Sequence, residues 1–480
     1  MKKRSIILWL LLCSVLWAEE VTFTEHPITT AGSGNPGLYA ADLDGDGDSD
    51  IAASVSSPQA LKWWRNEGDN LIMWTEFLIS NDPAFYIYAE DMNNDEHTDI
   101  LATYLNGQVA YWKNSGDSLP SWEKVIVATG FTSPHGIYAC DIDNDLDMDI
   151  LATSAGLGRI SWFEQDNDIW TQHIIATNFP YTQSVYAIDI DNDDDLDVLG
   201  ASGGGNELSL WYNLGGDPIS WQKQVVDDDF RMAHWVTSAD INNDDNFDIL
   251  GAAANDDEIA WWKNGGGVPI NWTKYVIASN VPCALTTQAA DLNRDGNLDV
   301  IANAWATDDI IWWEQEPGTP ISWIRHTIDT FNNGTWPIVA CDIDNDNAVD
   351  IVTGADVLTS GGTSAALTWW ENSLEISIDD TIHNSASGCL QIYPNPFSTS
   401  ITIQYFGKLS AHASPKFEIY NARGQFVRSL SSISNHQTSL AQAIWDGNDY
   451  LNRPVCSGLY YNILHIDGKQ ITADTCLLMR

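Results

Sequence analysis

Positive charge is scarce in this chain of 480 residues. It has 21 Lys and Arg against 67 Asp and Glu, which gives a formal net charge of −46. A chain with this balance repels phosphate backbones and anionic headgroups, so we expect neither nucleic acid nor anionic lipid as a partner. Hydrophobic residues still make up 44% of the chain and charged residues only 18%. A disordered acidic polymer is therefore excluded as well.

Long apolar runs are absent beyond the first twenty residues. The chain starts with Lys2, Lys3 and Arg4, followed by an apolar run over residues 6–17 and then Ala18. This layout is typical of a secretory signal peptide, here residues 1–18, and the run is too short to span a bilayer. An uncleaved N-terminal anchor is the alternative. We expect the mature chain to be exported and to contain no transmembrane segment.

Common catalytic and cysteine motifs are missing too. The seven cysteines show no CxxC spacing. Cys140 and Cys341 are interpreted as small buried hydrophobes, and a disulfide among Cys389, Cys456 and Cys476 is left open. The sequence has no Ser-His-Asp order, HExxH motif or phosphate-binding glycine loop. This favours a non-catalytic protein. A calcium-dependent polysaccharide lyase or a glycoside hydrolase is the alternative, because such chemistry needs little more than carboxylates.

The chain does contain seven copies of one acidic pattern, D-x-[DN]-x-D-x-x-x-D. Successive copies start 49, 50, 48, 51, 51 and 51 residues apart. Positions 1, 5 and 9 are Asp in every copy, and position 3 is Asp in four copies and Asn in three. In chain order, the residues at these positions are Asp42, Asp44, Asp46 and Asp50; Asp91, Asn93, Asp95 and Asp99; Asp141, Asp143, Asp145 and Asp149; Asp189, Asp191, Asp193 and Asp197; Asp240, Asn242, Asp244 and Asp248; Asp291, Asn293, Asp295 and Asp299; Asp342, Asp344, Asp346 and Asp350.

The spacing of these oxygens predicts calcium. Carboxylates packed a few ångströms apart repel one another unless a cation lies among them. Ca²⁺ takes six to eight oxygen ligands, and loop positions 1, 3 and 5 suit it, with a backbone carbonyl near position 7. Position 12, which is Glu in an EF-hand, holds Ala, Gly or Thr here, so Asp at position 9 must close the site. We predict up to seven structural Ca²⁺ ions. Seven solvated acidic turns that bind nothing are the alternative.

The rest of each repeat predicts four short strands. A segment such as Val185–Ile188 precedes the acidic loop, a small apolar segment follows it, and two aromatic strands come next, as in Ile259–Trp262 and from Trp272. Four strands in about fifty residues indicate a propeller blade. The seventh repeat lacks its fourth strand, which residues 21–29 can supply. We therefore predict an all-β fold, with a seven-bladed β-propeller over residues 19–372 closed by the N-terminal strand.

The acidic loops, the W-W-x-N strands and the W-T-x-x-x-I strands resemble FG-GAP/VCBS-type repeats. Such repeats form calcium-binding β-propellers, commonly in secreted bacterial proteins. The resemblance covers about three quarters of the chain. It implies an extracellular binding or display scaffold more often than a catalyst.

The composition changes after Asn372. Residues 373–388 are predicted to be a linker, and residues 389–480 to form a small β-sandwich. The ordered motifs Y-P-N-P-F at 393–397, I-Y-N at 419–421, W-D-G at 445–447 and S-G-L-Y at 457–460 resemble the type A sorting domain of the type IX secretion system. This resemblance implies export across the outer membrane and attachment to the bacterial surface, with the secretion machinery as a partner. An ordinary β-sandwich binding module is the alternative.

Three tryptophans suggest where a ligand binds. Of the 20 Trp in the propeller region, 17 recur at the third or fourth strand of a repeat. The exceptions, Trp235, Trp305 and Trp336, map to the face opposite the acidic loops. Tyr104, His135 and His234 fall in equivalent loops. We expect these residues to form a carbohydrate site, since a sugar offers an apolar face and hydroxyl edges. The alternative is that the aromatics plug the channel mouth.

Together these patterns predict a secreted or surface-attached, calcium-stabilised β-propeller. We expect a non-catalytic binding or adhesion module for a glycan or another extracellular ligand.

Overall fold

A computed structural model gives the structure of the chain. It describes residues 21–30, 34–56, 59–68, 72–82, 84–166, 169–330, 335–355 and 367–373, and, further along, 389–393, 400–406, 415–421, 426–431, 440–448, 453, 455, 458–466 and 469–478. The predicted signal peptide and nearly all of the predicted linker lie outside these residues. The chain divides into two compact units, Met1–Glu375 and Ile376–Arg480.

The first unit is a ring of seven four-stranded antiparallel sheets, the blades. Blade 1 contains β2 (Gly34–Ala41), β3 (Asp50–Ser56), β4 (Gln59–Asn66) and β5 (Trp74–Ser80). Blade 2 contains β6 (Ile87–Glu90), β7 (Asp99–Tyr104), β8 (Gln108–Asn114) and β9 (Trp122–Ala128). Blade 3 contains β10 (Pro134–Cys140), β11 (Asp149–Ser154), β12 (Arg159–Asp166) and β13 (Ile169–Ala176).

The remaining blades repeat this order. Blade 4 contains β14 (Thr182–Ile188), β15 (Asp197–Ser202), β16 (Glu207–Asn213) and β17 (Trp221–Asp227). Blade 5 contains β18 (Ala233–Ala239), β19 (Asp248–Ala253), β20 (Glu258–Asn264) and β21 (Trp272–Ala278). Blade 6 contains β22 (Ala284–Ala290), β23 (Asp299–Ala304), β24 (Asp309–Glu316) and β25 (Ser322–Thr330). Blade 7 contains β26 (Thr335–Cys341), β27 (Asp350–Ala355), β28 (Leu367–Asn372) and the N-terminal strand β1 (Phe23–Thr29).

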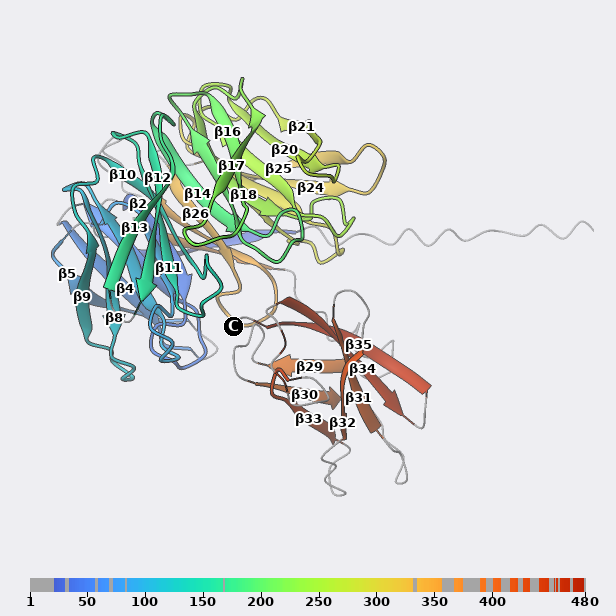
Figure 1. Ribbon diagram of the computed structural model, residues 1–480. Coiled ribbons are helices and arrows are strands. Elements are labelled where there is room, and N and C mark those ends of the chain that lie inside the picture. The colour runs from blue at the N-terminus through green and yellow to red at the C-terminus, as the bar shows by residue number, and fades with distance from the viewer. Residues whose placement is uncertain are drawn as a thin grey trace, which may run out of the picture. The chain divides into compact units, whose positions relative to one another are not determined.

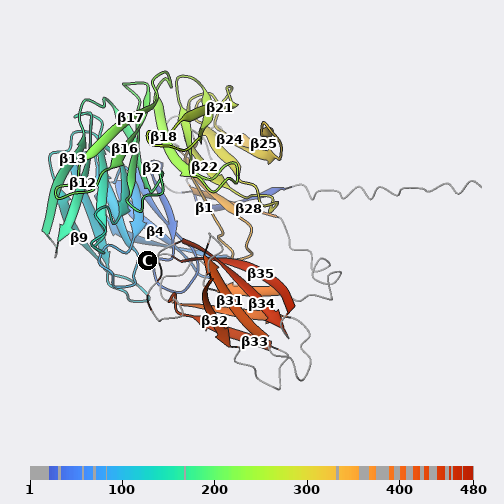
Figure 2. The ribbon, with the colours of Figure 1, turned by 45° about the vertical axis from the view of Figure 1, so that its right-hand side comes forward.

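Closure of the ring follows the prediction. β1 pairs antiparallel with β28, with Phe23 opposite Asn372 and His26 opposite Trp369. The first strand of each blade contacts the first strand of the next, and β26 returns to β2. In Figures 1 and 2 the colours run around this ring from blue through green to orange. Joining the two ends of the repeat region in one blade leaves no open edge between the first and last blades.

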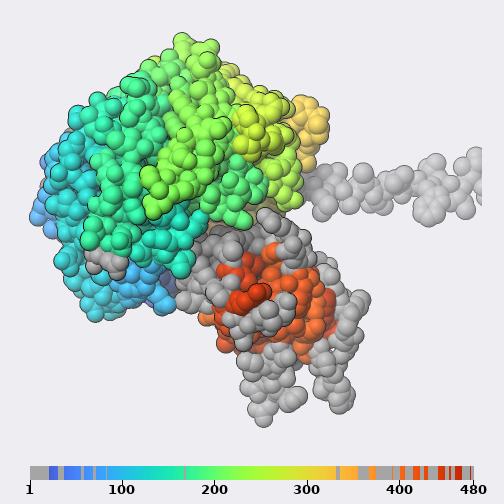
Figure 3. Space-filling model, in the orientation of Figure 1, coloured from blue at the N-terminus to red at the C-terminus, as the bar shows by residue number. Residues whose placement is uncertain are grey.

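Aromatic side chains of the third strands pack the blades together. Trp63, Trp64 and Trp262 are among the largest fully buried side chains of the chain. Successive residues of a strand point to opposite faces, so Trp63 and Trp64 are both buried because a blade is covered on both faces by its neighbours. In the space-filling view the blades lie against one another in chain order (Figure 3).

Three histidines of the outermost strands stack on tryptophans of the neighbouring strands. The His173 ring stacks on Trp162 with centroids 4.5 Å apart, and its Nε2 lies 2.6 Å from a Glu164 carboxylate oxygen. His26 and His326 repeat this arrangement with the equivalent Trp and Glu of blades 7 and 6.

The second unit is the predicted β-sandwich. Its two antiparallel sheets are β29–β30–β33 and β32–β31–β34–β35. The strands are β29 (Cys389–Tyr393), β30 (Ile401–Phe406), β31 (Pro415–Asn421), β32 (Phe426–Ser431), β33 (Leu440–Trp445), β34 (Gly458–Ile466) and β35 (Lys469–Leu478). Both sheets contribute to one core, in which Ile403, Phe417 and Trp445 are buried. The side chains of Cys389 and Cys456 lie outside the described residues. Cys476 is buried, and its Sγ accepts a hydrogen bond from Asn462.

The described residues contain no helix with the length and apolar character that crossing a membrane requires.

Candidate functional site

Each acidic loop joins the first and second strands of a blade and turns its carboxylates inward. Loop positions 4 and 6 have positive φ angles, between 55° and 96°, in all seven copies. Gly, Asn and Asp, which tolerate this conformation, fill most of these positions. The position 1 carboxylate accepts hydrogen bonds from the loop's own backbone, as Asp141 does from the N–H groups of Asp145 and Leu146. The sequence pattern therefore determines the shape of the loop.

The position 9 aspartate ties the loop to the sheet. It is at most 1% exposed in all seven blades. One of its oxygens accepts the backbone N–H of the Asn or Gln that follows the aromatic pair of the third strand, at 2.7–2.8 Å in every blade. The other oxygen accepts the N–H of loop position 2 in six blades, at 3.0–3.4 Å.

The same Asn or Gln links neighbouring blades, and we call these seven side chains the latch residues. They are Asn66, Asn114, Gln165, Asn213, Asn264, Gln315 and Asn372. Each donates a side-chain N–H to the carbonyl at loop position 2 of the preceding blade, at 2.7–3.3 Å. Asn66 of blade 1 reaches Ile343 of blade 7, so the series is closed. The latch residues therefore connect all seven loops into one ring.

Four loops bring their carboxylates into metal-binding geometry. In blades 1, 3, 4 and 7, ligand oxygens of positions 1, 3 and 9 lie within 4.8 Å of one another. In the same four loops one carboxylate oxygen, of Asp44, Asp143, Asp191 or Asp342, is buried and has no hydrogen-bond donor within the described part of the chain. A buried carboxylate oxygen without a donor is costly. A hard divalent cation, which takes oxygen ligands, fits this arrangement.

Burial without a counter-charge perturbs these acids. It raises the pKa of Asp50 and of Asp149 to about 8, although backbone N–H groups act in the opposite direction. Desolvation disfavours the charged form, and neighbouring carboxylates add repulsion. A bound cation would remove both penalties.

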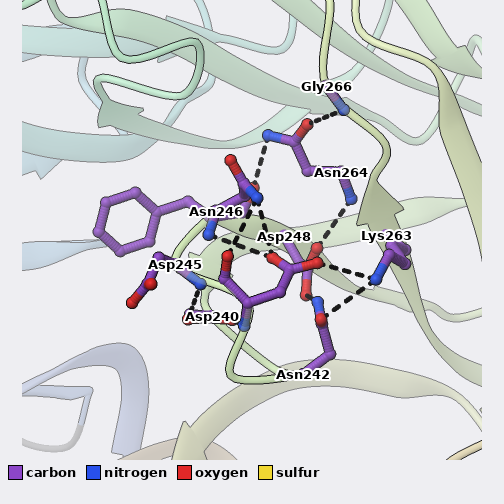
Figure 4. Close-up of polar contacts among 10 residues, drawn as sticks. Asp240, Asn242, Asp245, Asn246, Asp248, Lys263, Asn264 and Gly266 are labelled. Atoms are coloured by element: carbon purple, nitrogen blue, oxygen red, sulfur yellow. Dashed lines mark hydrogen bonds and ion pairs between the residues drawn. The ribbon is translucent and has the colours of Figure 1, made fainter. Parts of the chain in front are cut away.

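Two of the three loops with Asn at position 3 are satisfied differently. In blades 2 and 5, the Asn amide donates to the position 9 carboxylate, at 2.8 Å from Asn93 to Asp99 and 2.7 Å from Asn242 to Asp248. In blade 5, shown in Figure 4, Lys263 also lies 2.8 Å from Asp244. Burial raises the pKa of Asp248 only to about 6. Internal donors thus partly satisfy the position 9 carboxylate in blades 2 and 5.

The residue before each latch residue sets the charge beside its loop. Blades 2 and 5 have lysines there, Lys113 and Lys263, which pair with position 5. Blades 3 and 7 have Glu164 and Glu371, which add repulsion at the position 3 aspartates. The charge beside the loops therefore differs, and it is more negative in blades 3 and 7 than in blades 2 and 5.

The predicted ligand residues divide into three groups. The expectation that Tyr104 faces a ligand is wrong, because it is 1% exposed, its hydroxyl accepts the Trp112 indole N–H at 2.7 Å, and Lys124 covers its ring. Trp305 is 37% exposed in the turn after β23, and no ring contact in the described structure joins it to Trp235 or Trp336. The predicted single patch of three tryptophans is therefore not formed.

His135, His234, Trp235 and Trp336 do lie together, near the ring axis. The Trp336 ring lies 5.4 Å from His234 and 6.0 Å from Tyr86, and His135 lies 6.0 Å from Tyr86 (centroids). Both histidines are buried, and their Nδ1 atoms bond to Gln183 Oε1 at 2.6 Å and to the Leu285 carbonyl at 2.8 Å. Crowding around the axis, where seven strands converge, explains why they are buried rather than exposed.

The sequence reasoning missed a belt of side chains that lines the axis. Its members stand three residues before position 1 of each loop, and we call them the axial belt. They are Tyr39, Tyr88, Tyr138, Tyr186, Thr237, Gln288 and Val339. The four tyrosine rings lie 4.8–5.0 Å apart in sequence around the ring. Their fixed offset from the acidic loops was the signal that could have revealed them.

Two family matches agree with these observations. Residues 42–102, 91–152, 240–302 and 291–353 match the FG-GAP-like repeat, and residues 391–447 match the secretion system C-terminal sorting domain. The chain carries FG-GAP-like repeats and a secretion system sorting domain. The predicted resemblance is thereby confirmed at both ends of the molecule. The sorting domain indicates type IX secretion, with that system as a partner and the cell surface or the extracellular space as the destination.

Other comparisons are more distant. No curated protein matches the sequence. Two solved structures, of BBS1N in complex with ARL6DN soaked with lead or with mercury, are 11% identical to this chain with a TM-score of 0.49. The matched region covers 74% of this chain and 97% or 96% of the chain in each solved structure.

Proposed function

We propose that this surface or secreted FG-GAP-like propeller is a calcium-stabilised binding module for carbohydrate. The observation that carries the metal assignment is the set of buried carboxylate oxygens without donors in blades 1, 3, 4 and 7. Oxygen-only donors with several carboxylates favour Ca²⁺, whose flexible geometry suits a nine-residue loop.

The calcium ions are structural in this proposal. Extracellular sites often bind with Kd near 10⁻⁴ M, and at ~1 mM Ca²⁺ mass action then adds about 1.4 kcal/mol of stability per site. The four loops with complete aspartate sets would together add about 6 kcal/mol, which is comparable to the whole stability of a domain. Because the latch residues join every loop to the preceding blade, this stabilisation spreads to the whole ring.

The carbohydrate assignment rests on the axis at the end remote from the calcium loops. There Tyr86, Trp235 and Trp336 combine aromatic surface with polar hydrogens that have no acceptor within the described residues. A pyranose presents an apolar face for the rings and oxygen acceptors for the N–H and O–H groups. The strongly negative propeller disfavours an anionic ligand.

Three measurements test the proposal. Calorimetric titration of the chelated protein should reveal calcium binding, and the melting temperature should rise with Ca²⁺ but not with Mg²⁺ at the same concentration. A melting temperature indifferent to chelator would refute the structural role of calcium. A glycan array probed with the calcium-loaded protein should reveal binding to neutral glycans, and an array without any signal would refute the carbohydrate assignment.

Incubation of the calcium-loaded protein with polysaccharides examines the alternative of catalysis. Release of reducing ends or unsaturated sugars from plant or algal polysaccharides would identify a hydrolase or lyase and replace the binding-module proposal.

A further inference from the structure

The strands around the axis enclose a cavity of about 280 Å³. All seven members of the axial belt line it, and so do Tyr86 and Trp235 at the end remote from the calcium loops. At ~30 Å³ per molecule, this volume corresponds to about nine waters. It lies at the lower limit of ordinary ligand pockets, so an occupant would be no larger than a monosaccharide.

The belt is asymmetric, and this asymmetry creates the space. Blades 1 to 4 contribute tyrosines, whereas blades 5, 6 and 7 contribute Thr237, Gln288 and Val339. If the belt only had to fill the axis, seven large residues would do so, since each blade supplies an equivalent position. One wall of the cavity is therefore aromatic, and the opposite wall is small and polar or aliphatic.

The belt also presents hydroxyl groups in series. Hydrogen bonds join each of these side chains to the next one around the ring. The order is Tyr39, Tyr88, Tyr138, Tyr186 and Thr237. A hydroxyl has one donor and two acceptor sites, so each one within the series keeps one acceptor site. Gln288 Oε1 is already engaged, because it accepts the Ala340 N–H at 2.8 Å.

Tyr86 and Trp235 line the remote end of the cavity, and Trp336 lies beside Tyr86; each of the three carries a buried polar group without a partner in the described part of the chain. Tyr86 is 5% exposed, and its hydroxyl, the Trp235 indole N–H and the Trp336 indole N–H are buried without a partner among the described residues. The three side chains belong to one aromatic cluster. A buried donor without a partner costs about 1–3 kcal/mol. Of the three, Tyr86 and Trp235 line the cavity, where a bound molecule can supply acceptors.

The charge around the cavity decides the class of ligand. Burial lowers the pKa of His234 to about 4 and also lowers that of His135, so neither ring attracts an anion at neutral pH. The carboxylate of Glu90, at the end of β6, acts on the belt residue Tyr39 and disfavours an anion there. A quaternary ammonium ion would gain from the tyrosine faces but would leave the donors of Tyr86 and Trp235 unpaired. A neutral polyol satisfies both the rings and the donors.

We propose that the axial cavity binds a single neutral sugar residue, held between the tyrosine wall and the donors of Tyr86 and Trp235. This inference rests on the proposed carbohydrate function and locates it at the axis, away from the exposed Trp305.

The sharpest test uses a hydroxyl without a partner. In Tyr86→Phe the fold loses no hydrogen bond, so the melting temperature should stay the same or rise, while affinity for a bound monosaccharide should fall about five- to tenfold. Tyr104→Phe is the matched control, because its hydroxyl is paired with Trp112. That variant should melt lower and bind equally well.

A second variant fills the cavity. Val339→Tyr gives blade 7 the residue that blades 1 to 4 already have, so it should fold and abolish monosaccharide binding, whereas Val339→Thr preserves the volume and should bind. The calcium-loaded full chain would be titrated calorimetrically with glucose, galactose, mannose, fucose, xylose and choline.

The outcomes separate the two proposals. Binding of one sugar that Tyr86→Phe weakens and Val339→Tyr abolishes supports the inference. Glycan-array binding that both variants retain overturns the axial site but leaves the carbohydrate function standing. Binding of choline but of no sugar overturns the inference. A cavity that holds only water, so that none of the six compounds binds, overturns it too. A wild-type protein that binds no glycan of any kind overturns both.

Discussion

The latch residues provide a direct test of how the ring is held closed. Asn114, 2% exposed, donates to the Leu43 carbonyl of blade 1 at 2.7 Å and to the Thr98 carbonyl at 3.0 Å, and it accepts the Gly116 N–H at 2.9 Å. Asn114→Ala removes all three bonds and leaves the Leu43 carbonyl unpaired at the blade interface. At about 0.5–1.5 kcal/mol per bond, we expect a loss of about 2–4 kcal/mol.

For a unit of this size, that loss should lower the melting temperature by about 3–5 °C in saturating calcium. The assay is differential scanning calorimetry, with the calcium stoichiometry measured in parallel and expected to remain unchanged. Asn114→Gln is the control within the chain, because Gln165 and Gln315 make the equivalent bonds in blades 3 and 6. It should cost less than about 1 kcal/mol. An Ala variant as stable as the wild type, or a Gln variant as unstable as Ala, would refute the latch.

Three further predictions concern the loops and the sandwich. Asn93→Asp should add one tight calcium site, and Asp143→Asn should remove one, as counted by calorimetric titration; an unchanged count would contradict the difference between the Asp and Asn loops. Without calcium, stability should fall as the pH rises from about 5 to 8, because buried acids such as Asp149, with a pKa raised to about 8, hold a proton only in the folded state. In saturating calcium the stability measured by urea titration should instead rise with pH, since protons then compete with the metal for the same carboxylates. Trp445→Ala should destabilise the sorting domain by about 3–5 kcal/mol in chemical denaturation while leaving the propeller transition in place.

The sequence was sufficient for the architecture because the information is local and repeated. Each acidic loop holds its own turn residues, such as Gly45 and Gly47, and each blade has strands whose aromatic pairs must be buried on both faces. Seven copies with one missing strand then required closure by residues 21–29, and β1 does pair with β28. The order of four short motifs was likewise enough to indicate the sorting domain, whose sandwich core contains Trp445.

Tertiary structure decided what depends on neighbouring blades. The sequence placed Tyr104 in a loop equivalent to that of His135, but only packing showed that its ring is buried and its hydroxyl paired with Trp112. The latch from Asn66 joins it to Ile343, 277 positions away in the chain. The axial belt and the surroundings of the Tyr86 hydroxyl likewise depend on residues from several blades. Local periodicity determines which face of a strand a side chain occupies. Convergence of seven strands on one axis determines what it meets there, and that is where the proposed sugar site lies.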